Sequence, residues 1–144
     1  MYTKEYLTRT FVIEGRIDKL CEKIEMLRTK QSSVGSFGLG VQQSRNYRQQ
    51  EDISISILEL ESDMAEEKMT LLALETEIRA ASRILDNPVS RAIITWRYIC
   101  RLKWKDIARR AEMSEMQIIR EHNAAILNMD HEIFTRQSDF RKIM

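Results

Sequence analysis

Apolar residues recur at alternating steps of three and four along the first part of the chain, which is the spacing of a coiled-coil seam. The first run consists of Ile13, Ile17, Leu20, Ile24 and Leu27. The second, longer run consists of Ile53, Ile57, Leu60, Met64, Leu71, Leu74, Ile78, Ala81 and Leu85, with Glu67 at one seam position. The pattern predicts two long helices, over residues 3–30 and 49–86.

Between the two runs, residues 31–48 show no periodicity and hold three of the four glycines together with several serines. This composition indicates a loop or flexible linker. Helices joined by a loop this short pack antiparallel, so residues 1–86 are predicted to form an N-terminal antiparallel coiled-coil hairpin. The seams alone also allow pairing between two chains.

Pro88 marks the end of the hairpin, because proline is disfavoured inside a helix but tolerated in the first helical turn, where Asn87 can act as the cap. A helix over residues 89–102 is expected to follow. Its inward residues are predicted to be Val89, Ile93, Trp96 and Ile99 or Cys100. With two further short helices it would build a small three-helix core, and Trp96 and Trp104 are expected to fill part of that core.

Residues 97–127 have the pattern of a helix-turn-helix. The residues that share one face of its first helix are Trp104, Ile107, Ala108 and Ala111. Ser114 has the position of an N-cap, and Gln117 completes a capping box, so a second helix should begin near Glu115. The inward stripe of that helix is predicted to be Ile118, His122, Ala125 or Ile126, and Met129. The helix-turn-helix domain is therefore expected to span residues 87–129. Residues 130–144 show no clean period and are expected to be a C-terminal tail, either a short helix, a partner-binding segment or disordered chain.

The motif residues of this segment are Arg97-Tyr98-Ile99, Trp104, Asp106-Ile107-Ala108, Ser114, Ile118 and Ala125. They resemble the promoter-reading C-terminal helix-turn-helix of bacterial sigma factors. The chain is still more similar to small phage-encoded late transcription regulators of the ArpU and RinA type, in which such a sigma-like domain follows a coiled-coil hairpin. The likeness includes the V-Q-Q-S run at residues 41–44.

The chain departs from this family at two positions. The family usually has glycine in the turn where Glu112 stands, and serine or threonine where Lys103 stands. A left-handed conformation at Glu112 would cost about 1 kcal/mol relative to glycine.

The net charge of +1 conceals a segregation of charge along the chain. Residues 1–50 carry a net +4, residues 51–86 a net −7, and residues 88–129 a net +4. The acidic second helix should therefore pair with the basic first helix, and its charge disfavours pairing with its own copy. The basic third segment suits a polyanion such as DNA.

The composition favours helices and offers little for catalysis. One proline, four glycines and 31% charged residues indicate an all-α fold. His122 and His131, like Cys21 and Cys100, have no metal-ligand or catalytic spacing, so no enzyme, metal or cofactor is expected. His122 should be packed, and both cysteines should be buried thiols. No apolar run has the length of a membrane span or the form of a signal peptide, which favours the cytoplasm of a bacterial host cell.

The resemblance implies a sequence-specific transcription regulator that binds double-stranded DNA in phage or prophage late-gene control, with RNA polymerase or a second copy as further candidate partners and no small-molecule substrate. The residues expected to read base edges are Glu115, Met116, Ile119 and Arg120. The residues expected to contact phosphates are Lys103, Lys105, Arg109, Arg110 and Asn123. Two alternatives are a coiled-coil adaptor that binds protein as a sigma-factor mimic, and the small subunit of a phage DNA-packaging enzyme.

Overall fold

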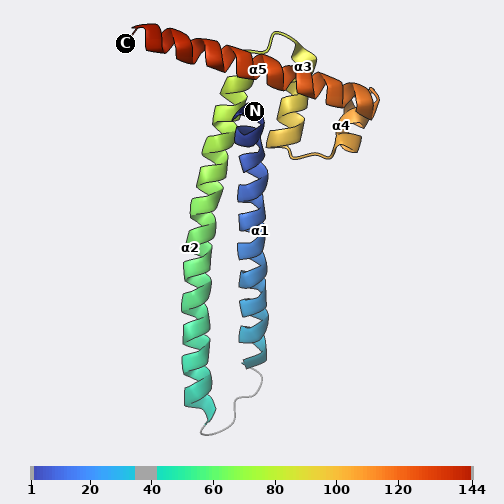
Figure 1. Ribbon diagram of the computed structural model, residues 1–144. Helices are drawn as coiled ribbons and strands as arrows, with labels where there is room; N and C mark the ends of the chain where they lie inside the picture. The colour runs from blue at the N-terminus through green and yellow to red at the C-terminus, as the bar shows by residue number, and fades with distance from the viewer. Residues whose placement is uncertain (1, 35–41, 144) are drawn as a thin grey trace. The chain divides into compact units, whose positions relative to one another are not determined.

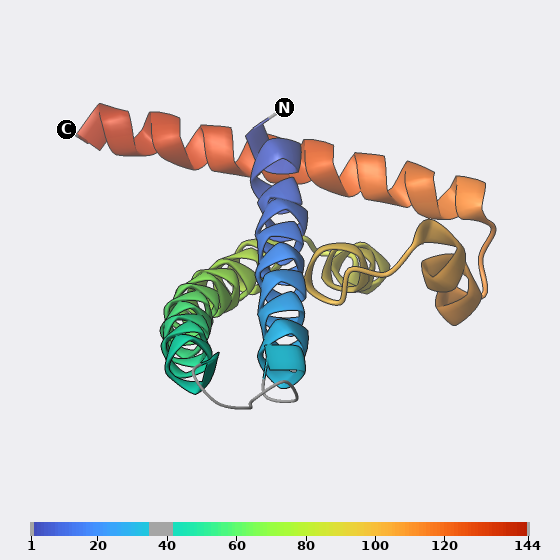
Figure 2. The ribbon, with the colours of Figure 1, turned by 90° about the horizontal axis from the view of Figure 1, so that it is seen from below.

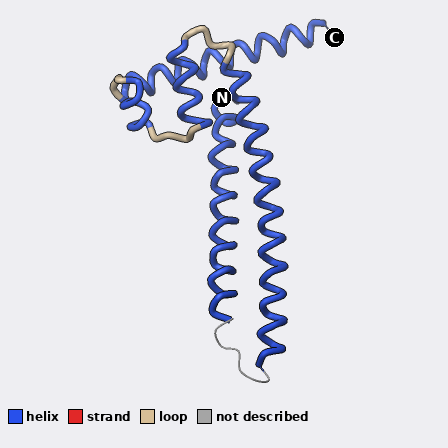
Figure 3. The backbone as a smooth tube through the Cα atoms, turned by 180° about the vertical axis from the view of Figure 1, so that it is seen from behind, coloured by secondary structure: helices blue, strands red, loops and turns tan. Residues whose placement is uncertain are grey.

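The computed structural model describes residues 2–34 and 42–143, and side chains within 3–33 and 47–131. Its elements are α1 (Tyr2–Val34), α2 (Gln42–Ser82), α3 (Pro88–Ile94), the π-helical turn η1 (Thr95–Ile99), α4 (Trp104–Ala111) and α5 (Glu115–Ile143) (Figure 1). The described residues contain no strand (Figure 3), so the predicted all-α class is confirmed. No described helix has an apolar stretch long enough to cross a membrane.

The chain divides into two packed units, and α1 and α2 contribute to both. Ile13–Leu71 form the first, which we call the hairpin unit. Met1–Val12 and Leu72–Met144 form the second, which we call the helix-turn-helix unit. The seam pattern groups residues 1–86 together, whereas in the structure both ends of that stretch belong to the same unit as α3, η1, α4 and α5.

The predicted seam forms the core of the hairpin unit. Ile24 of α1 is buried against Ile53 and Ile57 of α2. The half-buried residues around this cluster are Leu27, Leu60 and Met64. Burial of one such side chain contributes about 1.5–3 kcal/mol, so these contacts dominate the pairing. The two helices therefore pair within the chain, and they run antiparallel (Figure 1).

Charged residues beside the seam form cross-helix ion pairs. Arg28 Nη2 lies 2.7 Å from Glu61 Oε1, and Arg16 Nη1 lies 3.7 Å from Glu67 Oε1. Glu67 is the charged residue at a seam position, and the contact with Arg16 gives its carboxylate a partner there. Exposed pairs of this kind contribute only about 0.2–1 kcal/mol each. The basic and acidic helices thus pair as the charge pattern predicts, although the apolar seam contributes more.

Helical structure extends into the predicted loop from both sides, since α1 ends at Val34 and α2 begins at Gln42. Gln31 Nε2 donates to Ser54 Oγ at 2.8 Å, which fixes the last turns of α1 against α2. A polar bond of this kind lets the paired helices continue beyond the last apolar seam residue, and the seam pattern does not reveal it. The glycine-rich residues 35–41 lie outside the described part of the chain.

In the helix-turn-helix unit, α3, α4 and α5 enclose a small core (Figure 2). Ile93, Ile107 and Ile118, one from each helix, are fully buried there. Trp96 and Trp104 pack against this cluster and are partly buried, which confirms that both are core residues.

The first residues of α1 also belong to this unit. Leu7 is fully buried. The Thr3 N–H donates to Asp130 Oδ1 of α5 at 3.0 Å, and the Thr3 hydroxyl donates to the same oxygen. The Tyr6 hydroxyl donates to Glu77 of α2, and burial together with this carboxylate raises the pKa of Tyr6. The start of α1 is therefore bonded both to α5 and to the end of α2.

The helix predicted over residues 89–102 is interrupted, because α3 ends at Ile94 and the wider turn η1 follows. The Cys100 N–H donates to Thr95 O at 3.0 Å, an i to i+5 bond. The extra residue in this turn shifts the inward face, so Tyr98 and Ile99 are both buried. Cys100 is consequently exposed, contrary to the prediction.

Two further predictions about single residues are wrong, and one is confirmed. Cys21 is exposed, because it lies beside the seam rather than in it. Val89 is exposed at the first turn of α3, where the chain has only just entered the helix. Asn87 caps α3 as predicted, since its Oδ1 accepts the Val89 N–H at 3.0 Å, and Pro88 occupies the first turn.

Helix α5 continues through the predicted C-terminal tail to Ile143. Figures 1 and 2 show its later turns extending past α3 and α4. Met129 is buried at the last position of the inward stripe, next to the Asp130 carboxylate that bonds Thr3. The contact with Thr3 comes from a distant part of the chain. The local pattern of residues 130–144 therefore does not indicate where the helix ends.

Candidate nucleic-acid interface

A tight turn joins α4 to α5 and fixes the angle between them. Glu112 has the left-handed backbone angles φ 55° and ψ 41°. The Met113 N–H donates to Ala108 O at 3.1 Å, and the Glu112 N–H donates to Arg109 O at 3.4 Å. These are the two bonds of a Schellman C-cap, and the Met113 side chain packs against the core. Glu112 thus adopts a conformation that glycine adopts more easily, at a cost of about 1 kcal/mol.

The predicted capping box at the start of α5 is confirmed. The Gln117 N–H donates to Ser114 Oγ at 3.2 Å, and the Ser114 N–H donates to Gln117 Oε1 at 3.3 Å. Caps of this kind contribute about 0.5–2 kcal/mol. They fix the start of α5 at Glu115, and the start of the helix decides which later side chains face outward.

The four α5 residues predicted to read base edges lie on the exposed side of its first turns. Met116 is 73% exposed and Ile119 39%, and Glu115 and Arg120 are exposed as well. Residues three and four apart share one face of a helix, so these side chains lie near one another. The predicted inward stripe is buried throughout, namely Ile118, His122, Ala125, Ile126 and Met129.

Cationic side chains gather on α4 and at its N-cap. Those that are exposed, as expected for phosphate contacts, are Lys103, Lys105, Arg109 and Arg110. Lys103 is the N-cap residue, with an extended backbone (φ −71°, ψ 152°), and its side chain makes no cap bond. A serine or threonine would bond a helix N–H from that position. With lysine there, the N-terminal amides of α4 have no side-chain acceptor from the cap.

Tyr98 and His122 form a buried hydrogen bond between η1 and α5. The Tyr98 hydroxyl lies 2.5 Å from His122 Nε2, and His122 Nδ1 lies 3.2 Å from Asn123 Oδ1. Burial raises the pKa of Tyr98 to about 12 and lowers the pKa of His122. A protonated phenol therefore donates to a neutral imidazole, whose Nδ1–H donates to Asn123. Asn123 is exposed, and the bond to His122 uses only its Oδ1.

Arg97 holds the connection between η1 and α4, a role that the sequence did not suggest. Its guanidinium carbon lies 4.4 Å from the Trp104 ring centroid and 5.0 Å from the Phe11 centroid. Its Nη1 donates to Leu102 O at 2.9 Å. Phe11 also contacts Tyr98 edge-on, with ring centroids 5.8 Å apart. In the sequence, an arginine that precedes a helix with a tryptophan gives only a weak indication of this packing. On α1, the one indication is that Phe11 lies beside the seam.

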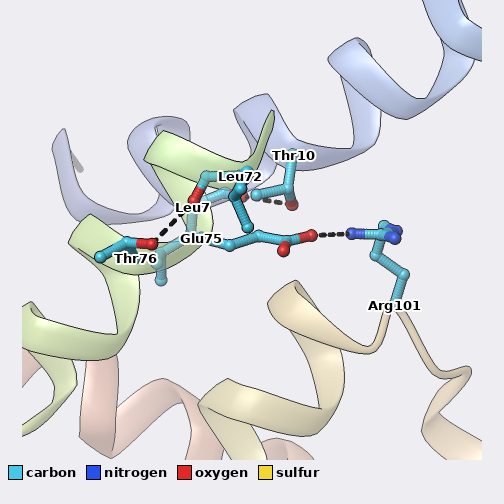
Figure 4. Close-up of polar contacts among 6 residues, drawn as sticks. All are labelled: Leu7, Thr10, Leu72, Glu75, Thr76 and Arg101. Atoms are coloured by element: carbon cyan, nitrogen blue, oxygen red, sulfur yellow. Dashed lines mark hydrogen bonds and ion pairs between the residues drawn. The ribbon is translucent and has the colours of Figure 1, made fainter. Parts of the chain in front are cut away.

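Arg101 forms a second link to the long helices, which Figure 4 shows in close-up. Its Nη1 lies 2.6 Å from Glu75 Oε1 on α2, and both side chains are largely buried. Arg101 also has a left-handed backbone, with φ 56°. The two left-handed residues, Arg101 and Glu112, lie on either side of α4, so its direction is fixed at both ends.

Acidic pH is expected to destabilise the helix-turn-helix unit through His122. Burial lowers the pKa of His122, so the unfolded chain takes up a proton near pH 6.5 that the folded chain resists. The His122 contribution is complete above about pH 6.5 and is lost as the pH falls toward the folded-state pKa, with a limiting slope of about 1.4 kcal/mol per pH unit. Urea denaturation followed by tryptophan fluorescence, from about pH 7.5 to about pH 5.5, measures it.

Substitution of the histidine itself is the control for this pH effect. His122→Asn should flatten the dependence of unfolding free energy on pH over this range. Equal slopes for His122→Asn and the unaltered chain would contradict a neutral, buried His122.

Comparison with protein-family models, curated proteins and solved structures finds no match to this chain. Within the described residues, no group of three or more His, Cys, Asp or Glu side chains could hold a metal ion.

Proposed function

We propose that the chain is a sequence-specific DNA-binding transcription regulator that inserts the start of α5 into the major groove. The observation that carries this proposal is the exposed set of Glu115, Met116, Ile119 and Arg120 on a helix whose start is fixed by a cap and a tight turn. A helix-turn-helix presents the N-terminal residues of its second helix to base edges. Phage or prophage late-gene control in a bacterial cytoplasm, with RNA polymerase as a partner, follows from the family resemblance.

The cations of α4 suit contacts with the DNA backbone. Lys103 and Lys105 lie at the N-terminus of this helix, where the helix dipole and the free amides favour an anion. Contacts of this type orient a protein on DNA without reading its sequence. They also make affinity dependent on salt, because bound cations displace counterions from the phosphates.

Few of the outward residues can read a base by hydrogen bonds. Arg120 suits the acceptors of guanine and Glu115 suits the amino group of cytosine, while Met116 and Ile119 offer only apolar contact, for instance to a thymine methyl. The affinity of one copy for its site should therefore be modest. A second contact, with RNA polymerase or with another copy on the same DNA, would raise it.

Arg120→Ala and Lys105→Ala are expected to weaken DNA binding in different ways. Loss of a base contact at Arg120 should cost about 1–3 kcal/mol on a selected site and much less on random duplex. Loss of a phosphate contact at Lys105 should weaken binding to both duplexes alike and make the slope of log affinity against log salt shallower by about 0.9. The measurement is a salt series on a site selected from a random pool and on random duplex.

Lys19→Ala serves as the control for this experiment, because Lys19 is an exposed lysine of the hairpin unit. Its removal should leave the salt slope as it is. If selection recovers no preferred DNA, or if Arg120→Ala weakens both duplexes equally while Lys105→Ala alters neither slope nor affinity, the major-groove proposal fails.

A protein-binding adaptor is the second candidate, and the apolar surface of α5 favours it. Leu127 is exposed two turns beyond Ile119 and continues the outward face begun by Met116. Exposed apolar residues that line one face of a helix are common where proteins bind each other. In that case Met116→Lys would abolish binding to polymerase while DNA selection recovers nothing.

A further inference from the structure

The outward face of α2 carries a second set of residues at coiled-coil spacing. These residues, which we call the outer stripe, are Ile55, Leu58, Ser62, Ala65 and Met69. Their steps are three, four, three and four, and the same spacing reaches Leu72. All five are exposed, and the large side chains of Leu58 and Met69 are 65% and 68% exposed. Apolar residues sustained at this spacing are typical of a helix that packs against another helix on that side.

The outer stripe lies away from the seam that α1 covers. Ile53 and Ile57 of the seam are buried. Ile55, which lies between them in the sequence, and Leu58, which follows Ile57, are exposed. At about 100° per residue, the outer stripe is rotated roughly 150° from the seam. The pairing of α1 with α2 therefore leaves this face of α2 open.

We propose that the outer stripe pairs antiparallel with the outer stripe of a second copy, so that α2 forms a homodimer contact. A two-fold axis near Asp63 places Leu58 against Met69 of the partner subunit and Ser62 against Ala65 of the partner subunit. The two-fold axis repeats each contact. The small residues then lie at the centre, where they let the helices approach closely, and the larger ones lie at both ends.

The charges beside the outer stripe select the antiparallel direction. Lys68 is the one cation between residues 49 and 78. In the antiparallel pair it lies across from Glu61 of the partner subunit, and symmetry gives two such contacts. The Glu61 carboxylate also contacts Arg28 of its own chain, so Lys68 adds a second cation to it. In a parallel pair, Glu61 would face Glu66 of the partner subunit instead. The antiparallel pair also keeps an unfavourable contact between Glu59 and Glu66 of the partner subunit, which symmetry likewise repeats, so apolar burial must drive the association.

The size of the contact indicates a reversible dimer. The outer stripe spans about 20 Å from Ile55 to Met69 at 1.5 Å per residue. Stable dimers usually bury about 1,200–2,000 Å² in total, and two helices that touch over this length bury less. The chain should therefore exchange between monomer and dimer at micromolar concentrations. This interface lies apart from the start of α5 and does not depend on DNA binding, so the two proposals can fail separately.

Sedimentation equilibrium of the full chain, without DNA, tests the dimer. The mass should rise from one chain toward two as the concentration increases. Leu58→Glu puts two acidic side chains into the apolar contact and should raise the dissociation constant about tenfold or more. Because Leu58 is exposed in the single chain, circular dichroism of this variant should stay unchanged, which separates lost association from lost folding.

A matched pair of lysine substitutions tests the antiparallel register. Glu59→Lys converts both unfavourable contacts with Glu66 of the partner subunit into attractive ones and should lower the dissociation constant about tenfold, whereas in a parallel pair residue 59 would face Ser54 of the partner subunit and the substitution would have little effect. Asp63→Lys makes the same change in net charge at an exposed position away from the stripe's flanks, and its effect should stay within about twofold. Equal effects of the two substitutions would overturn the register. A chain that remains monomeric at every concentration, or a dimer that Leu58→Glu leaves intact, would overturn the interface.

Discussion

Replacement of Ile118 by alanine should lower the free energy of unfolding of the helix-turn-helix unit by about 2–5 kcal/mol. Ile118 is fully buried where α5 meets Ile93 of α3 and Ile107 of α4. Because the core is small, few other side chains can move in to fill the cavity that the substitution leaves. Since whole domains are stable by only about 5–15 kcal/mol, much of the unit should be unfolded in mild urea.

Tryptophan fluorescence is the appropriate measurement for this variant. Trp96 and Trp104 are the only tryptophans of the chain, and both pack against the core that contains Ile118. Ile119→Ala is the matched control, because the neighbouring side chain is exposed. Its unfolding free energy should change by less than about 0.5 kcal/mol, while its affinity for a selected DNA site falls. Equal destabilisation by both substitutions would mean that the inward and outward faces of α5 are wrongly assigned.

Ile24→Asp should destabilise the hairpin unit by roughly 3 kcal/mol or more, because it places a carboxylate in the seam without a cationic partner. Ile24 is 4% exposed and contacts Ile53 and Ile57. The long helices depend on this seam, since most of the stability of a helix in a protein comes from packing of its apolar face. Far-ultraviolet circular dichroism during urea denaturation should show an earlier loss of helix than in the unaltered chain.

Met26→Asp provides the control on the same helix, two residues further along. Met26 is 72% exposed, so its replacement by aspartate should leave the denaturation midpoint close to that of the unaltered chain. The paired-seam interpretation would be untenable if both aspartates shifted the midpoint equally.

The sequence predicts those parts of the fold that rest on local periodicity. The seam from Ile13 to Leu27 and its counterpart on α2, the Asn87 cap and the Ser114 capping box all depend on residues within a few turns of each other. Contacts between distant segments leave no such pattern. The bonds from Thr3 to Asp130 and from Arg101 to Glu75 join residues that no local rule relates, so the packing of the two ends of the hairpin with α3–α5 was not foreseen.

The candidate site likewise has features that local periodicity predicts and features that it does not predict. The exposure of Arg120 and the burial of Ile118 follow from helical periodicity once the Ser114 cap fixes the start of α5. The π-helical turn at Thr95–Ile99 could not be predicted from periodicity, because nothing in its composition distinguishes it from an ordinary helix. That turn makes Tyr98 face His122, and it explains why Cys100 points outward against expectation.

The link between Thr3 and Asp130 also affects when the chain can fold. The two residues are 127 positions apart. At a synthesis rate of about 5–20 residues per second, Thr3 is made roughly 6–25 s before its partner. The hairpin unit needs only residues up to Leu71 and can form during that interval, whereas the helix-turn-helix unit must wait for α5. On the ribosome, the surface proposed to read DNA would mature only after the hairpin unit has formed.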